Sequence, residues 1–352
     1  MDRPRRRFLS AVLGGLVVPM SAVGQAPNRV FRVAYLCGVL IAPEQDATSE
    51  GYFETVRQQL ETHGFVRGRN LEIRFLSRPT NTPGGWDGPW RQQLVAEATA
   101  WKPDVMVVPS AAFVRTAKQA RTSVPIVFAL VQDPVSEGLV ASLSKPEANI
   151  TGAGIDYDTL SIKRLELVRE VLPAVRRVAL VFDGRYGGIP VSARSQFRRA
   201  AERWNIAISE INVASVDGGL CNAAKSVHEA RADAVLPVGN IGPPMNDTSA
   251  KSWVQGYGDC LYELQTKSRL PVFDDSADTV AQGVMAAVGE DSNESFRRAA
   301  DVAVRILKGA RPTEVPVDMQ MRVQLIINAR SAAQLGVTLP QSVLTRADRV
   351  IR

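Results

Sequence analysis

The stretch DVMVVPSAAFVRTAKQARTSVPIVFALVQDPV, residues 104–135, decides the fold. Its residues 105–108 form a short, continuously apolar run, which is typical of a parallel strand buried on both faces. Ser110 then provides a favourable N-cap for a helix, and Pro125 ends the helical pattern. Residues 126–129 are again continuously apolar. The stretch therefore predicts a strand–helix–strand unit of a parallel α/β sheet.

Ligand contacts are expected at the carboxyl ends of these two strands, because open parallel sheets bind ligands there. The amides at the start of the helix carry a partial positive charge, which suits a carboxylate or another anion. Asp133 precedes Pro134 and is more typical of a helix cap than of a ligand contact. The residues of this stretch that are predicted to face a ligand are Ser110, Ala111, Ala112, Val131 and Gln132.

The alternation of strands and helices continues on both sides of this unit. Residues 29–36 and 71–76 are predicted strands before it, and a helix is expected over residues 135–144 after it. A second series of alternating elements follows in the C-terminal half of the chain. Two parallel α/β sheets in succession predict two lobes with a ligand cleft between them.

The first 26 residues are predicted to be an export signal. RRRFL at residues 5–9 opens an apolar run, and small residues follow at Gly24 and Ala26. The run is too short to span a bilayer, and the paired arginines fit a twin-arginine signal that a receptor reads. We expect export to the periplasm and removal of the leader. A cut after Gly24 is favoured, because Pro27 hinders cleavage after Ala26.

Charge and cysteine content narrow the class of protein. The formal net charge is +6, and the leader carries half of it. Since no basic run remains outside the leader, the sequence does not predict nucleic-acid binding. The three cysteines, Cys37, Cys221 and Cys260, contain no CxxC pair. Their odd number favours three unpaired, buried thiols and leaves a bridge between Cys221 and Cys260 open.

From Phe31 to the C-terminus, the sequence resembles the ABC-transporter substrate-binding family whose characterised members take up aromatic amino acids. Each motif is short, but together they cover nearly the whole mature chain in order. The matching segments are GFVRGRNLEIRF (64–75), KPDVMVV (102–108), VPIVFALVQDPVSEGLVASLSKPEANITG (124–152), KRLELVREVLP (163–173), RVALVF (177–182), RLPVF (269–273), AVRILKGARPTEVPVD (303–318) and LIINARSAAQLGVTLPQSVLTRADRVI (325–351). The chain departs from the family at residues 79–89, at a longer insert over residues 239–259, and at Ala287-Val288-Gly289, where the family has Ser-Tyr-Gly.

The resemblance implies the type I periplasmic-binding-protein fold, with two Rossmann-like lobes, a hinge of three crossing segments and an interlobe ligand cleft. Lobe 1 is expected to comprise residues 27–150 with about 285–328, and lobe 2 residues 151–284 with about 329–352. The implied function is that of the periplasmic solute-binding component of an ABC importer. It would bind an amino acid or a related small carboxylate and deliver it to a permease in the inner membrane. A monomer without cofactor or metal is expected.

Further candidate ligand contacts follow other predicted strands. Gly38 and Val39 end the first strand, where a plain turn is an equal interpretation. In lobe 2 the loop DGRY, residues 183–186, offers a carboxylate for an ammonium group and a ring for an aromatic ligand, although its aspartate equally suits a turn. The lobe 2 candidates are Asp183, Tyr186, Asn240, Asp274 and Asp275, and the sequence does not distinguish which of the last two faces the cleft.

Two groups of residues are predicted to have structural roles. Trp86 and Trp90 are interpreted as pinning their own Pro/Gly-rich loop rather than covering the cleft. Lys163, Arg164 and Arg169 are interpreted as a solvated helix face.

An enzyme on an α/β fold is the alternative class. His63 and His228 lie on predicted helices rather than after strands, which leaves a Ser-His-Asp relay unsupported. The sequence contains no cluster with metal-ligand spacing and no dinucleotide or phosphate-loop motif. A ligand-sensing partner of a membrane receptor is a second interpretation within the binding class. A DNA-binding repressor is disfavoured, since the leader occupies the place of its DNA-binding helices.

Overall fold

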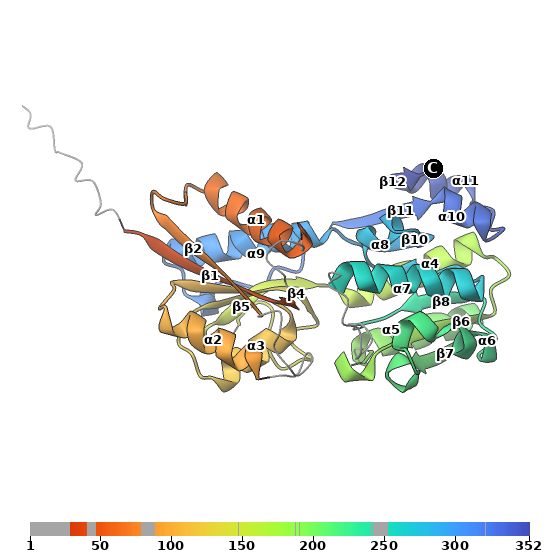
Figure 1. The fold of residues 1–352 in the computed structure, drawn as a ribbon, viewed down its shortest axis with the longest axis horizontal. Coiled ribbons are helices and arrows are strands. Elements are labelled where there is room, and N and C mark those ends of the chain that lie inside the picture. Colours follow the sequence, from red (N-terminus) through yellow and green to blue (C-terminus); the bar gives the residue numbers. More distant parts are fainter. Residues whose placement is uncertain are drawn as a thin grey trace, which may run out of the picture.

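The computed structural model describes residues 29–40, 47–78, 89–146, 148–186, 188–189, 191–239, 241, 253–320 and 322–352. These residues form two α/β lobes that lie side by side along the longest axis of the molecule (Figure 1). The predicted two-lobed α/β class is therefore confirmed.

Lobe 1 is built on a five-stranded parallel sheet with the order β2-β1-β3-β4-β5. Its helices cover both faces of the sheet, with α1 and α9 on one face and α2 and α3 on the other. Its elements are β1 (Phe31–Leu40), α1 (Ala47–Thr62), β2 (Leu71–Arg78), α2 (Trp90–Ala100), β3 (Val105–Pro109), α3 (Ala111–Gln119), β4 (Ile126–Gln132), β5 (Ile150–Ile155), α9 (Ser292–Leu307) and a 3-10 turn at Pro312–Glu314.

The strands of lobe 1 are apolar without interruption because both of their faces are buried. In β3, Val105 and Val107 pack in the core beneath α1 and α9, whereas Met106 and Val108 pack in the core beneath α2 and α3. All four side chains are fully buried. This is the arrangement that a continuously apolar run predicts for a parallel strand.

Lobe 2 contains a three-stranded sheet, β7-β6-β8, and a four-stranded sheet, β12-β11-β10-β9. A parallel bridge between Val235 and Val272 joins the two sheets. Strand β11 runs antiparallel to β10, and the other pairings are parallel. Its elements are α4 (Tyr157–Val171), β6 (Arg177–Phe182), α5 (Val191–Trp204), β7 (Ala207–Asn212), α6 (Ala224–Glu229), β8 (Ala234–Pro237), α7 (Trp253–Ser268), β9 (Phe273–Asp274), α8 (Ala277–Ala281), β10 (Ala286–Glu290), β11 (Val323–Asn328), α10 (Ala329–Gln334), α11 (Gln341–Arg346) and β12 (Arg349–Ile351), with 3-10 turns at Gly184–Tyr186, Val213–Ser215 and Gly219–Asn222.

Within the described residues, three segments of the chain pass between the lobes. The first leads from β5 into α4, and the second leads from β10 into α9. The third lies along β5 at Asp318, whose carbonyl accepts a hydrogen bond from the Gly154 amide (2.8 Å), and then enters β11. These are the three crossing segments that the resemblance implied.

Two expectations differ from the structure. Residues 135–144 form turns and bends rather than the predicted helix. At the start of the first turn, Asp133 Oδ1 accepts a hydrogen bond from the Ser136 amide (3.2 Å). Residues 285–328, expected in lobe 1, are divided between the lobes. Helix α9 packs on the lobe 1 sheet, whereas β10 and β11 pair inside the lobe 2 sheet, because their partners are β9 and β12.

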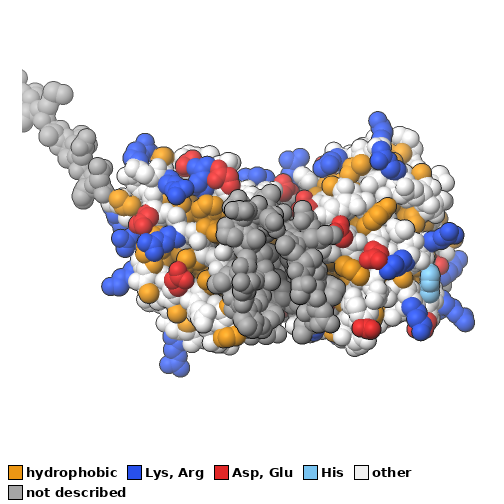
Figure 2. Space-filling view, in the orientation of Figure 1, with side chains coloured by type: hydrophobic (Ala, Val, Ile, Leu, Met, Phe, Trp, Pro, Cys, Tyr) orange, Lys and Arg blue, Asp and Glu red, His pale blue; other side chains and the backbone are white. Residues whose placement is uncertain are grey.

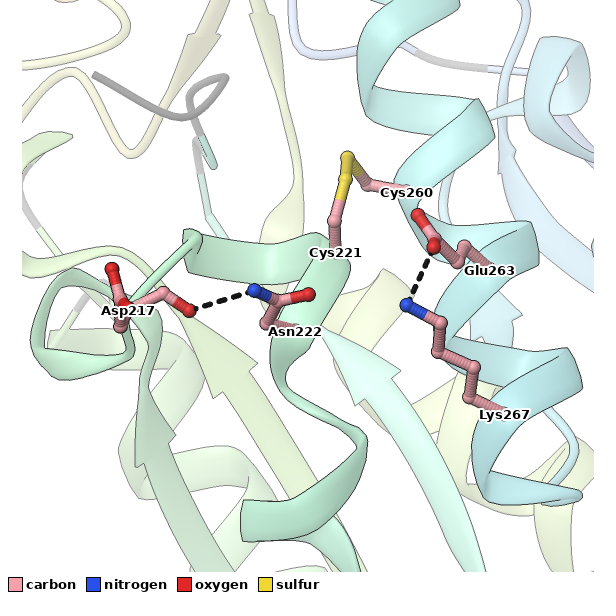
Figure 3. Close-up of a disulfide and its surroundings, with 6 residues drawn as sticks. All are labelled: Asp217, Cys221, Asn222, Cys260, Glu263 and Lys267. Carbon is pink, nitrogen blue, oxygen red and sulfur yellow. Dashed lines mark hydrogen bonds and ion pairs between the residues drawn. A yellow bond between two sulfur atoms is a disulfide. The ribbon is translucent and has the colours of Figure 1, made fainter. Parts of the chain in front are cut away.

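Cys221 and Cys260 form a disulfide that ties a 3-10 turn to helix α7 (Figure 3). Asn222 donates a hydrogen bond to the Asp217 carbonyl on one side of the disulfide, and Lys267 forms an ion pair with Glu263 on the other. Cys37 is a buried thiol outside this disulfide. The prediction of three unpaired thiols was therefore wrong, since the fold brings together two cysteines that are 39 residues apart.

Among the described residues, no helix combines the length and the apolar character that a membrane span needs. Positive and negative side chains are interspersed over both lobes on the face drawn in Figure 2.

Candidate functional site

Ser110 occupies the carboxyl end of β3, directly before helix α3. Its backbone has φ 83° and ψ 150°, a region that residues with a side chain rarely adopt. The expected side-chain cap is absent, because Ser110 makes no capping hydrogen bond to α3. Its Oγ is buried and has no hydrogen-bond partner among the described residues. The position therefore combines a strained backbone with an unused hydroxyl group beside the first amides of a helix.

The other candidates that follow β3 and β4 lie at the same edge of the lobe 1 sheet, where these two parallel strands end. Ala111 and Ala112 form the first turn of α3 and are half-buried. Val131 and Gln132 end β4, but the Val131 side chain is 1% exposed and belongs to the lobe 1 core. Gln132 is half-buried. Of these two neighbouring residues, Gln132 is therefore the one whose side chain is open to a solute.

Two further lobe 1 predictions have different outcomes. Gly38 and Val39 lie within β1, which extends to Leu40 instead of turning after Cys37.

Trp90 is 1% exposed and packs edge-on against Phe113, with ring centroids 5.8 Å apart. Trp90 is therefore a core residue of lobe 1. Residues 79–88 of the loop that it was predicted to pin, with Trp86 among them, lie outside the described residues.

Asp274 and Asp275 follow one another at the carboxyl end of β9 in lobe 2. Asp274 is fully buried and accepts hydrogen bonds from the Tyr257 hydroxyl (2.8 Å) and the Thr279 hydroxyl (2.7 Å). Asp275 is 25% exposed at its side chain and accepts a hydrogen bond from the Tyr157 hydroxyl (2.6 Å). Of the two carboxylates, Asp275 is therefore the one that a solute can reach.

Arg164 lies beneath these carboxylates and is fully buried. Its Nη2 donates to the carbonyls of Pro237 and Phe273, which end β8 and begin β9. Its Nη1 lies 3.8 Å from Asp275 Oδ2. The prediction of a solvated face was wrong for Arg164, because α4 turns this residue toward the sheet, whereas Lys163 and Arg169 are exposed.

The charges of these residues act on one another's ionisation. Burial, and then the charge of Asp275, raise the pKa of Asp274 to about 6, against the opposing effect of Arg164. Burial and the adjacent carboxylates raise the pKa of Tyr157 and of Tyr257 well above the ordinary value, so both hydroxyls are neutral donors. Two carboxylates thus share one guanidinium. We call Tyr157, Arg164, Tyr257, Asp274 and Asp275 the lobe 2 acidic cluster.

Three members of the lobe 2 acidic cluster were missed by sequence reasoning. Tyr157 starts α4, and its hydroxyl also accepts a hydrogen bond from the Gly239 amide (3.0 Å). Tyr257 comes from α7 and lies within the longer insert over residues 239–259, where the family motifs give no guidance. A signal existed for Arg164, since it lies four residues from both Leu160 and Val168 on the buried face of α4.

Asp183 is already engaged within its own loop. It is fully buried, and Arg185 donates to it through Nε (2.9 Å) and Nη2 (2.5 Å). The Arg185 amide also donates to Asp183 Oδ1 (3.0 Å). Its carboxylate therefore stabilises a turn, the alternative that the sequence left open. Tyr186 lies in the following 3-10 turn, and Asn240 lies outside the described residues.

The histidines lie in other surroundings. His63 contacts Asp301 Oδ1 (2.8 Å) on the outer face of lobe 1, and His228 contacts the Ser268 carbonyl (2.8 Å). Within the ranges that the structure describes, no group of histidine, cysteine, aspartate or glutamate residues has the arrangement of a metal site.

The fold places the chain in the class of two-lobed, type I periplasmic binding proteins. A family model described as "ABC transporter substrate binding protein" matches residues 89–351. The chain belongs to this family, whose members are solute-binding proteins.

Individual proteins are similar to this chain in sequence or in fold. A "Tyrosine-binding protein" of Clostridioides difficile (strain R20291) is 24% identical over 287 residues, which cover 81% of this chain and 75% of the relative. A Streptococcus pneumonia structure described as an ABC domain in complex with L-Trp has a TM-score of 0.71 at 21% identity, covering 92% of this chain and 100% of that chain. A conserved domain protein of Vibrio cholerae has a TM-score of 0.73 at 24% identity, with the same two coverages.

Proposed function

We propose that the chain is the periplasmic solute-binding component of an ABC importer and that it binds an amino acid or a related small carboxylate between its lobes. Export through the N-terminal leader and delivery to an inner-membrane permease are parts of this proposal. The ligand assignment depends on one observation: the lobe 2 acidic cluster contains two carboxylates and only one guanidinium. Asp275 is its partly exposed member and has acceptor capacity beyond the Tyr157 hydroxyl.

An α-amino acid has opposite charges on neighbouring atoms, and the two lobes offer complementary groups. Its ammonium would pair with Asp275, because an ionised carboxylate accepts charge-assisted hydrogen bonds. Its carboxylate would accept from the Ser110 hydroxyl and from the first amides of α3, where the helix dipole favours an anion. A ligand that bridges the lobes would stabilise their closed arrangement. The names of the tyrosine-binding relative and of the L-Trp complex support a ligand of this class.

We expect an amino acid to raise the melting temperature of the mature chain. Free ligand at about 100 times its Kd adds about 2.7 kcal/mol to the free energy of unfolding, a rise of a few degrees for a protein of this size. A thermal-shift series would compare tyrosine, tryptophan and other amino acids with two derivatives of each. The N-acetyl derivative lacks the ammonium, and the amide derivative lacks the carboxylate. Sugars serve as the matched set of neutral solutes. Equal shifts for an amino acid and both of its derivatives would contradict the two-ended recognition.

The Asp275→Asn variant is expected to bind the amino acid about 10- to 100-fold more weakly, since a hydrogen bond between charged groups contributes about 1.5–3 kcal/mol. Asparagine retains an acceptor for the Tyr157 hydroxyl but carries no charge. The variant should therefore also lose the preference for the amino acid over its N-acetyl derivative, which titration calorimetry measures. Glu202→Gln is the control, because it removes one negative charge at an exposed residue of α5. Unchanged affinity in Asp275→Asn would remove Asp275 from the site.

A further inference from the structure

Arg298 of helix α9 is bonded to all three segments that cross between the lobes. Its Nη2 donates to the Gly154 carbonyl (3.2 Å) in the first crossing segment. Its Nε (3.1 Å) and Nη2 (2.6 Å) donate to Glu290 Oε1, at the end of β10 in the second. Its Nη1 donates to the carbonyl (3.0 Å) and to Oδ1 (3.2 Å) of Asp318 in the third. One guanidinium thus uses its planar fork to hold three segments that are far apart in the sequence.

This group of residues is buried at the junction. Arg298 and Glu290 are each 7% exposed, whereas the Asp318 side chain is 32% exposed. Burial raises the pKa of Glu290 to about 7, and the charge of Arg298 opposes that rise. The second oxygen of Glu290 has no hydrogen-bond partner among the described residues. Arg298 therefore favours the ionised form of this carboxylate against the effect of burial.

The second crossing segment also touches the backbone of the lobe 2 acidic cluster. A Cβ atom added to Gly289 would lie 1.6 Å from the Asp275 carbonyl oxygen, so β10 lies directly against the residue that we assign to the ligand. Gly154 is similarly confined, since a Cβ there would lie 2.4 Å from the sulfur of Met319. A rotation of one lobe against the other must change the backbone of these segments.

We propose that Arg298 is the hinge clamp of this protein: it binds the three crossing segments to one another and thereby restricts the arrangements that the two lobes can adopt. The clamp positions the lobes and does not contact the ligand. It extends the proposed solute-binding role, because lobe closure is the motion that the clamp would control. Its test, however, needs no ligand.

Spin labels at Glu97→Cys in α2 and Glu202→Cys in α5 would report the distance between the lobes. Both positions are exposed, and the native cysteines are either buried or in the disulfide. In the ligand-free protein, Arg298→Met is expected to give an interlobe distance distribution about twice as broad as that of the wild type, since three restraints are lost together. Arg298→Lys, which can restore one charged contact but not the fork, should be intermediate.

The neighbouring Arg297→Met variant is the matched control. Arg297 pairs at the surface with Glu294 of its own helix and with Asp291, the residue between β10 and α9, and its side chain is 40% exposed. Neither of these two ion pairs joins one crossing segment to another. Its distance distribution should equal that of the wild type. If Arg298→Met does not fold, Asp318→Ala removes the side-chain contact of the clamp at a partly exposed residue and should broaden the distribution to a smaller extent. A wild-type distribution in folded Arg298→Met, or in Asp318→Ala when Arg298→Met cannot be obtained, would overturn the proposal. A failed ligand screen would leave this result unaffected and would weaken the proposed function instead.

Discussion

Replacing Cys221 and Cys260 together by serine is expected to lower the free energy of unfolding by about 4 kcal/mol. The disulfide closes a loop with a sequence separation of 39 residues, and the chain-entropy model gives a cost of this size for releasing such a loop. The effect should concentrate in lobe 2, because both cysteines belong to it. Denaturant unfolding followed by circular dichroism would measure the change in midpoint, with the slope m checked for two-state behaviour.

Reduction of the wild-type protein provides the control for this prediction. A reducing agent should move the wild-type unfolding curve to that of the double variant and should leave the double variant unchanged. Cys37 does not interfere, because it is a buried thiol outside the disulfide in both proteins. Identical unfolding curves for the oxidised wild type and the double variant would show that the bridge adds no stability.

The Arg164→Met variant is expected to lose about 3–5 kcal/mol of stability at pH 7, the usual cost of removing one partner from a buried ion pair. Methionine fills most of the volume, so the loss is electrostatic. The carbonyls of Pro237 and Phe273 would lose their donor, and Asp274 and Asp275 would face each other without a cation. Thermal and denaturant unfolding would give the magnitude.

The pH dependence separates this cause from a packing defect. The folded pKa of Asp274 is about 6, above its ordinary value of 3.8, so the protonated form contributes stability below pH 4 that is lost as the pH rises through 6. Arg164 lowers that pKa, and its removal should raise it further. The deficit of Arg164→Met should therefore be largest near pH 8 and smaller near pH 5. Arg169→Met, on the exposed face of the same helix, should show a change of less than about 1 kcal/mol and no such trend. A pH-independent deficit in Arg164→Met would contradict the electrostatic account.

Most of the fold was predictable because its signals are local. The apolar runs of β3 and β4 and the helix between them appear in the sequence as they appear in the structure. The predicted helix over residues 135–144 did not form, although the chain there begins with a favourable Asp-Pro pair. The division of residues 285–328 between the lobes could not be predicted from local signals either. The strands with which β10 and β11 pair place them in lobe 2.

The candidate site was predictable to a smaller extent. Strand-end reasoning found Ser110, Asp274 and Asp275, because the polarity of a parallel sheet fixes where such residues gather. It could not distinguish the two aspartates, since their exposure depends on Tyr257 and Thr279, which come from other elements. Arg164 was assigned to solvent by its charge, although its spacing placed it on the apolar face of α4.

The sequence by itself determined the alternation of strands and helices, the two-lobed class and the family, since these depend on periodicity and on motifs in linear order. Only the tertiary structure decided the Cys221–Cys260 bridge, the burial of Arg164 against two carboxylates, and the contacts of Arg298 with three crossing segments. The physical reason is sequence distance. Backbone preferences act over a few residues, whereas these bonds join side chains that become neighbours after the sheets of the two lobes have formed.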